Sequence, residues 1–127
     1  MNIQEIKEKI LNGIKYTTNA KGYTLVKSGW GSVEDKCACA LSCLVLAEYD
    51  EKDIDHCRKE IKGGDIVKKA QQILQIDGSW ISSFWHGFDG VGGGCNAEAN
   101  QLGRDLAKEL NPPRFLETRR IKAKEKS

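Results

Sequence analysis

The sequence has little of what marks a fibrous, disordered or disulfide-stapled chain. It holds two prolines among 127 residues, and 39% of its residues are hydrophobic while 30% are charged. These proportions are ordinary for globular proteins and exclude the fibrous and disordered classes. A chain of this length buries roughly two thirds of its unfolded surface as one domain, so its core is stable without disulfide bonds or a structural metal ion.

Long apolar runs are also missing. The longest, residues 37–47, is interrupted by Ser42 and is about half as long as the roughly twenty residues that cross a bilayer. The N-terminal segment MNIQEIKEKI carries charges throughout and has no apolar centre, so no secretory signal is expected. We therefore expect no membrane association and a cytoplasmic location.

The five cysteines are an odd number, and three of them (Cys37, Cys39 and Cys43) lie close together in the apolar run. A secreted disulfide framework typically spreads an even number of cysteines over loops, so reduced thiols are expected. Cys39 and Cys43 share a helix face, and together with His56 and Cys57 they would make four ligands for one zinc ion. Because no paired C-x-x-C turn is present, core packing is favoured, and we expect no metal or cofactor.

Charge is distributed unevenly along the chain. Residues 114–127 hold six basic and two acidic residues, so this segment carries +4 and residues 1–113 carry −2 of the net +2. We predict a single globular helical domain over residues 1–113 and a basic, mobile C-terminal tail over residues 114–127. Nucleic acid is not an expected partner, because the field over the folded part has the wrong sign.

Hydrophobic periodicity predicts a mainly α-helical fold, because apolar residues recur every three or four positions in several segments. The expected helices cover residues 3–14, 33–49, 53–62, 65–76, 79–88 and 96–110. The segment 33–49 has almost no polar face, so the other helices must surround it. The predicted fold class is a compact single-domain bundle of five or six helices around a buried central helix.

Local signals add detail near the N-terminal half. Asn12-Gly13 is expected to fray the end of the first helix, because both residues tolerate left-handed backbone. Residues 16–27 allow a small β-hairpin or a single strand around 23–27. Ser32 and Asp35 fit a capping box that would start the central helix at residue 33.

The segment WISSFWHGFDGVGGGCN, residues 80–96, concentrates candidate functional side chains. Its large apolar residues fall on one side of a helix, and the glycines that follow end that helix. One hypothesis is a cysteine-dependent hydrolase or transferase, with Cys95 as nucleophile, His86 as base and Asp89 or Asn96 as the group that orients it. Cys95 directly precedes the next helix, whose dipole would lower its pKa.

The leading hypothesis is a non-enzymatic binding or adaptor protein. Its recognition surface would combine the Trp30 loop with the end of the aromatic helix and the glycine-rich loop, because exposed tryptophan and flexible glycine beside a rigid helix suit the rim of a pocket. The expected ligand-binding residues are Trp30, Trp85, Gly92, Gly93, Gly94 and Asn96, with His86 and Asp89 beside them. The expected partner is an unidentified protein or a small anionic ligand held by backbone N–H groups of residues 92–96.

Overall fold

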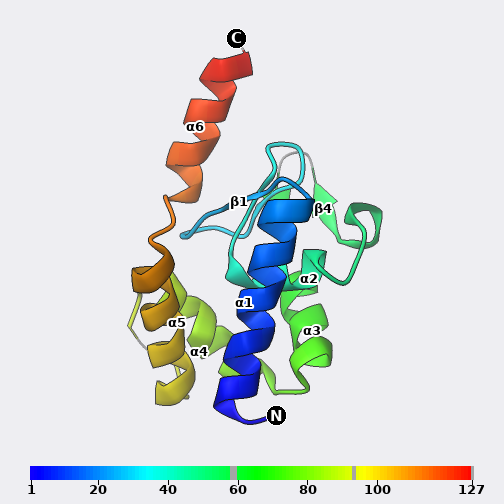
Figure 1. The fold of residues 1–127 in the computed structure, drawn as a ribbon. Coiled ribbons are helices and arrows are strands. Elements are labelled where there is room, and N and C mark those ends of the chain that lie inside the picture. Colours follow the sequence, from blue (N-terminus) through cyan, green and yellow to red (C-terminus); the bar gives the residue numbers. More distant parts are fainter. Residues whose placement is uncertain (58–59, 93, 127) are drawn as a thin grey trace.

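The structure, a computed structural model, describes residues 1–57, 60–92 and 94–126. Within these ranges it contains six α-helices and five strands of two residues each (Figure 1). In chain order the elements are α1 (Ile3–Ala20), β1 (Thr24–Leu25), β2 (Gly31–Ser32), β3 (Cys37–Ala38), α2 (Ala40–Leu46), the 3-10 turn η1 (Glu51–Asp53), β4 (His56–Cys57), β5 (Glu60–Ile61), α3 (Gly63–Leu74), α4 (Gly78–Phe88), α5 (Ala97–Leu110) and α6 (Phe115–Lys126).

The fold is mainly helical and packs around α2, as the sequence predicts. Every residue of α2 is buried, and the main hydrophobic core joins it to side chains of α1, α3, α4 and α5. A helix without a polar face is stable only when its neighbours cover it on all sides. The fold class, a compact helical bundle with a buried central helix and a small sheet, is therefore confirmed.

The start of the central helix was predicted wrongly. Ser32 does accept a hydrogen bond from the Asp35 backbone N–H, at 3.1 Å, but this bond closes a turn between β2 and β3. The side-chain bond of a capping box is also the bond of a Ser turn, so the local pattern fits both structures. The helix begins at Ala40 because residues 37–38 pair with β1 and β2 instead.

The small sheet replaces the hairpin that was allowed for residues 16–27. Its strand order is β1-β3-β2, with β1 parallel and β2 antiparallel to β3. Residues 16–20 belong to α1, so β1 matches the single-strand alternative around 23–27. The antiparallel pair β2–β3 brings Trp30, which precedes β2, next to the start of α2, where the Trp30 carbonyl accepts the Cys39 N–H at 3.2 Å.

Helix α1 continues through the expected stop at Asn12-Gly13 and ends at Ala20. Gly13 is buried against α2, and a Cβ at this position would lie 2.8 Å from the Leu44 Cα. The glycine therefore serves close helix packing and does not end the helix. Thr17, one turn further on, donates its buried hydroxyl to the Cys43 carbonyl at 2.7 Å.

The helix expected at residues 53–62 is absent from the described part of this segment. The segment instead forms η1 and the antiparallel pair β4–β5, in which His56 faces Ile61 across the ladder. Ile54 and Ile61 are buried as the apolar pattern required, whereas Cys57 is exposed. The spacing therefore predicted the burial of the two isoleucines correctly, but it was wrong about Cys57, which was also expected to face inward, and about the backbone that carries these residues.

Helices α3, α4 and α5 agree with the expected segments to within a few residues. Asp77 caps α4 by accepting the Trp80 N–H, and Asn96 caps α5 by accepting the Ala99 N–H, both at 2.9 Å. Helices α4 and α5 lie side by side (Figure 1). Gly87 and Gly103 are buried where each meets the backbone of the opposite helix.

The segment after residue 113 forms α6, which projects from the other helices (Figure 1). Its first residue, Phe115, is buried with Val26 and Cys37 in a small second cluster. Lys122 donates to the Asp35 carbonyl at 2.5 Å. The mobility expected for residues 114–127 stays a prediction, although the beginning of this segment packs against the sheet.

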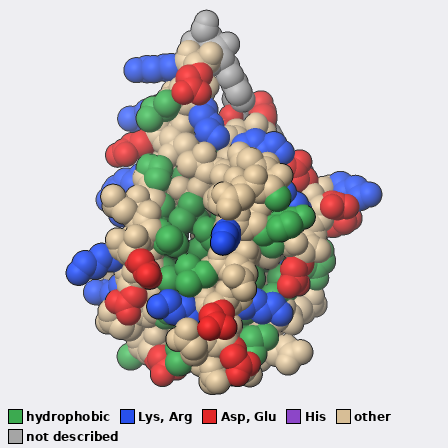
Figure 2. Space-filling view, in the orientation of Figure 1, with side chains coloured by type: hydrophobic (Ala, Val, Ile, Leu, Met, Phe, Trp, Pro, Cys, Tyr) green, Lys and Arg blue, Asp and Glu red, His purple; other side chains and the backbone are tan. Residues whose placement is uncertain are grey.

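The face that carries α1 is mixed in character. Figure 2 shows hydrophobic side chains gathered in its middle, with Lys, Arg, Asp and Glu side chains around them.

In the described ranges, no helix is both long enough and apolar enough to cross a bilayer.

Candidate functional site

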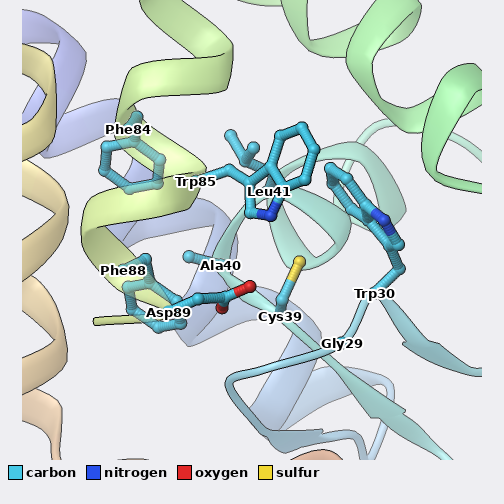
Figure 3. A pocket seen from close by; sticks show the side chains of 9 residues that line it. All are labelled: Gly29, Trp30, Cys39, Ala40, Leu41, Phe84, Trp85, Phe88 and Asp89. Carbon is cyan, nitrogen blue, oxygen red and sulfur yellow. The ribbon is translucent and has the colours of Figure 1, made fainter. Parts of the chain in front are cut away.

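A pocket lies where the C-terminal end of α4 meets the Gly29-Trp30 segment and the start of α2 (Figure 3). Its floor is apolar and comes mainly from Phe84, Phe88 and Leu41. Four side chains with polar groups line the rest: Trp30, Cys39, Trp85 and Asp89. The pocket thus combines residues from three segments that are distant in the sequence.

The helical period explains how α4 supplies both the floor and the wall. Phe84 and Phe88 are one turn apart and point into the core, and their rings stack with centroids 6.2 Å apart. Trp85 and Asp89 follow each of them by one residue, so they form the neighbouring stripe, which is only half-buried. This stripe faces the Trp30 loop.

Two indoles form one wall of the pocket. The ring centroids of Trp30 and Trp85 are 4.9 Å apart, and their planes are tilted by 52°. The indole nitrogen of Trp85 points toward Asp89 (Figure 3), whereas that of Trp30 lies against Gly63 of α3, where a Cβ would clash with the indole. Trp30 is therefore fixed between α3 and α4 although part of its surface is open.

Asp89 places a carboxylate beside these rings. It is the C-terminal cap residue of α4, and its Oδ1 accepts the Ser28 backbone N–H at 2.8 Å. Burial raises the pKa of Asp89, and hydrogen bonds from Ser28 and the Trp85 side chain oppose that rise. In the described part of the chain it has no salt-bridge partner. The pocket therefore contains a partly desolvated negative charge without an ion pair.

Cys39 contributes a thiol directly before α2. Its side chain is 7% exposed, and Sγ lies 3.4 Å from the Ser42 hydroxyl. Burial raises the pKa of Cys39 to about 11, although hydrogen bonds from Ser42 act in the opposite direction. The thiol is therefore protonated at neutral pH, and a protonated thiol is a poor nucleophile.

The pocket is small. The space open to the centre of a water molecule is about 20 Å³, little more than the roughly 10–15 Å³ that one water needs on this measure. Pockets that enclose a whole drug-sized ligand have volumes of roughly 300–1,000 Å³. This pocket therefore accepts one head group of a few atoms, and the rest of any ligand must stay outside.

The predicted site residues divide into two groups. Trp30, Trp85 and Asp89 line the pocket together. His86 lies beside it with its ring centroid 4.7 Å from that of Trp85, and its Nδ1 is buried with no hydrogen-bond partner among the described residues. His86 is close enough to Asp89 for its charge to lower the pKa of that carboxyl, against the larger effect of burial.

The glycine-rich loop lies against a different face of α4. Gly94 has a φ of +96° and packs against Ser83, whose hydroxyl accepts the Asn96 N–H at 3.1 Å. Gly92 and Cys95 are exposed. The pocket lining does not include Gly92, Gly94, Cys95 or Asn96. Gly93 lies outside the described residues. The catalytic roles assigned to Cys95, His86 and Asp89 remain predictions.

The anion site expected at residues 92–96 has fewer free donors than the sequence suggests. The Asn96 N–H donates to Ser83, and the Ala99 N–H donates to the Asn96 side chain. Both groups are backbone donors near the N-terminus of α5 that an anion would otherwise use. The protein itself therefore satisfies part of this helix end.

Sequence reasoning missed Cys39 and Gly29 as pocket residues and treated Cys39 as a core or metal-site cysteine. In the described ranges, no group of three His, Cys, Asp or Glu side chains is placed to hold a metal ion. All five cysteines are free thiols. No family model, no curated protein and no solved structure matches this chain.

Proposed function

We propose that the protein is a non-enzymatic binding protein that captures a small head group in the pocket between Trp30, Trp85 and Asp89. The observation that carries this proposal is the convergence on one small cavity of two half-buried indoles and the Asp89 carboxylate, which has no salt-bridge partner among the described residues. Sites for small ligands are typically concave and apolar, with a few fixed polar groups that set orientation.

The positions of the two tryptophans support a binding role. An indole side chain stabilises the fold most when it is fully buried, as Trp80 is. Trp30 and Trp85, in contrast, keep part of their surface exposed to solvent. Their packing against each other and against α3 holds that open surface in a fixed shape. A preformed aromatic surface loses little conformational freedom when a ligand binds.

Thiol catalysis has weaker support. The pocket thiol, Cys39, is protonated at neutral pH because burial raises its pKa. The predicted nucleophile Cys95 is exposed, and the next residue, Asn96, donates its backbone N–H to Ser83 on another face of α4. We therefore propose binding, and alkylation of the thiols in the native protein tests the enzyme alternative.

We also propose that the protein acts in a reducing compartment such as the cytoplasm. Five free cysteines support this, because unpaired thiols are common in the cytosol and rare among secreted domains of this size.

The test is a titration of nitrogen-15-labelled protein, followed through the three indole N–H signals. The probes are methylammonium, acetate and methanol, one for each charge class. We expect at least one probe to shift the Trp30 and Trp85 signals saturably while the signal of the buried Trp80 stays in place. Absence of a saturable shift with all three probes would contradict the proposal.

Two variants locate the binding in the pocket. Trp30→Leu should remove the saturable shift of the Trp85 signal, because one indole wall is lost. Tyr16→Ala removes an aromatic side chain that is 51% exposed on α1, outside the pocket, and should leave the titration unchanged. An equal loss of binding in both variants would mean that the probe acts on the whole surface.

A further inference from the structure

We propose that the head group is an ammonium, primary or methylated, held between the indole pair and the Asp89 carboxylate. This inference rests on the proposed binding function and gives it a ligand class. Its sources are a free small amine or a lysine side chain of a partner, since both present the same charged group at the end of a chain that can remain outside the pocket.

The charge of the pocket is the first argument. Asp89 is half-buried, accepts two hydrogen bonds and has no salt-bridge partner among the described residues. A desolvated charge is costly unless an opposite charge lies close to it. A bound cation would supply that charge, whereas an anion would meet repulsion from the same carboxylate.

The aromatic walls are the second argument. Cations are attracted to the face of an aromatic ring within about 6 Å of its centroid, and tryptophan is the strongest partner. The ring centroids of the two indoles are only 4.9 Å apart, so no group fits between the rings as in a sandwich. Their tilt of 52° leaves a corner that opens beside Asp89 and Cys39 (Figure 3). A cation placed over a ring face in this corner would lie beside the carboxylate, whereas the N–H edge of Trp85 that points toward Asp89 would repel it.

The size of the cavity is the third argument. Space of about 20 Å³ for the centre of a water molecule suits an ammonium or methylammonium group, each only slightly larger than water. An amidinium or a guanidinium is planar and wider. The cavity is partly open to solvent, so a linear chain attached to the nitrogen can leave it.

Three other titratable groups face Asp89. Lys27, in the segment after β1, and His86, on α4, act on its charge from outside salt-bridge range, and the Cys39 thiol approaches from the start of α2. Lys27 is a competing cation for this carboxylate. Its removal should therefore strengthen amine binding, which is the opposite of what an anion site would show.

The experiment compares probes on the intact chain through the Trp30 and Trp85 indole signals. We expect methylammonium to bind with a Kd in the millimolar range, because a ligand of two non-hydrogen atoms has few contacts to gain. Acetate and methanol should bind at least about tenfold more weakly, since neither is a cation. Equal or tighter binding of acetate or methanol would overturn the ammonium proposal and leave the binding function standing.

Variants then test the carboxylate. Asp89→Asn keeps an oxygen that can accept the Ser28 N–H and should weaken methylammonium binding about tenfold or more. Lys27→Gln should strengthen it by about twofold to threefold. Asp53→Asn makes the same charge change at an exposed carboxylate in η1 and should have no effect. Unchanged affinity in Asp89→Asn, with the melting temperature preserved, would overturn the proposal.

The dependence on pH gives a second readout. Burial raises the pKa of Asp89 above its ordinary value of 3.8, so the carboxylate is protonated, and amine binding lost, at a higher pH than for an exposed aspartate. Affinity should fall as the solution is acidified through this raised pKa. Affinity that rises on acidification would contradict the ammonium assignment.

A final comparison separates the two sources. Nα-acetyl-lysine methylamide and its Nε-monomethyl form represent a protein side chain, and methylammonium and dimethylammonium represent the matching free amines. Binding of either lysine compound at least about tenfold tighter than the matching free amine supports a side chain of a partner. Tighter binding of the free amines supports a metabolite, and failure of all four compounds in a protein that still binds methanol or acetate would overturn the ammonium class.

Discussion

Replacing Gly103 by alanine tests the close packing of α4 and α5, which positions Trp85 and Asp89. A Cβ at this position would lie 2.6 Å from the Phe88 nitrogen and closer still to the Phe84 carbonyl oxygen, whereas ordinary contacts are 3.4–4 Å. Both neighbours are backbone atoms, so no side-chain rotation relieves the clash. The two helices must separate by roughly 0.8 Å or more, as in an overpacked core.

The magnitude follows from two opposing terms. Overpacking costs about 1–3 kcal/mol, and two backbone contacts place this site at the upper end. Alanine regains about 1 kcal/mol because it is the better helix former. We expect Gly103→Ala to lower the free energy of unfolding by about 2 kcal/mol, and the melting temperature by roughly 6–10 °C for a chain of this length.

Urea unfolding measured by circular dichroism and tryptophan fluorescence gives the required free energies. The matched control is Gly64→Ala, also in a helix, where no atom lies within 4 Å of the new Cβ. The control should be as stable as the parent or up to about 1 kcal/mol more stable. A Gly103→Ala variant as stable as this control would refute the close approach of α4 and α5.

Three further predictions concern the thiols, the start of α5 and the packing of α6. Under native conditions a maleimide should modify the exposed Cys57 and Cys95 first, and the three buried thiols slowly, as counted by mass spectrometry; one fast thiol with a low apparent pKa would favour the enzyme alternative. Asn96→Ala should lower the free energy of unfolding by about 1 kcal/mol through loss of the cap, and Asn96→Ser should restore most of it in the same urea assay. Phe115→Ala should lower the free energy of unfolding by about 3 kcal/mol. Leu116 is 60% exposed, so Leu116→Ala should change this free energy by less than about 0.5 kcal/mol. Equal effects of the two substitutions would mean that α6 does not pack on the sheet.

The elements that could be predicted from the sequence are those whose signals are local and agree with one another. Helix α5 combines the cap Asn96, an apolar stripe through Leu102 and Leu106, and a left-handed Asn111 at its end. Helix α4 likewise has an apolar stripe of period 3.6, although its cap is Asp77, which the sequence pattern indicates equally well as the end of the preceding helix. In such segments the cap, the period and the stop signal describe the same helix, so tertiary packing has no reason to change it.

The failures occur where one local pattern fits two structures. Gly13 reads as a helix stop, but it allows α1 to approach the Leu44 backbone. Ser32 forms the side-chain bond of a cap within a turn. In both cases the deciding contact is with a residue of another element, and no rule of spacing contains it. Pairing of residues 37–38 with two strands then shortens the central helix at its N-terminal end.

The candidate site was predicted in part for the same reason. Trp30, Trp85 and Asp89 were recognisable as unusual residues near turns, and the structure brings them together in one pocket. Cys39 and Gly29 join them only because β2 pairs with β3 and because the Trp30 carbonyl accepts the Cys39 N–H. The helical period separates the glycine-rich loop from this pocket, since Ser83 and Asp89 lie on different faces of α4.

A crystal structure of the protein grown in methylammonium chloride tests the central claim most directly. We expect the Trp30 and Trp85 rings in contact, with the amine nitrogen in the corner beside them at hydrogen-bond distance, about 2.7–3.2 Å, from an Asp89 carboxylate oxygen. Separated indoles, or an empty pocket with amine bound elsewhere on the protein, would contradict it.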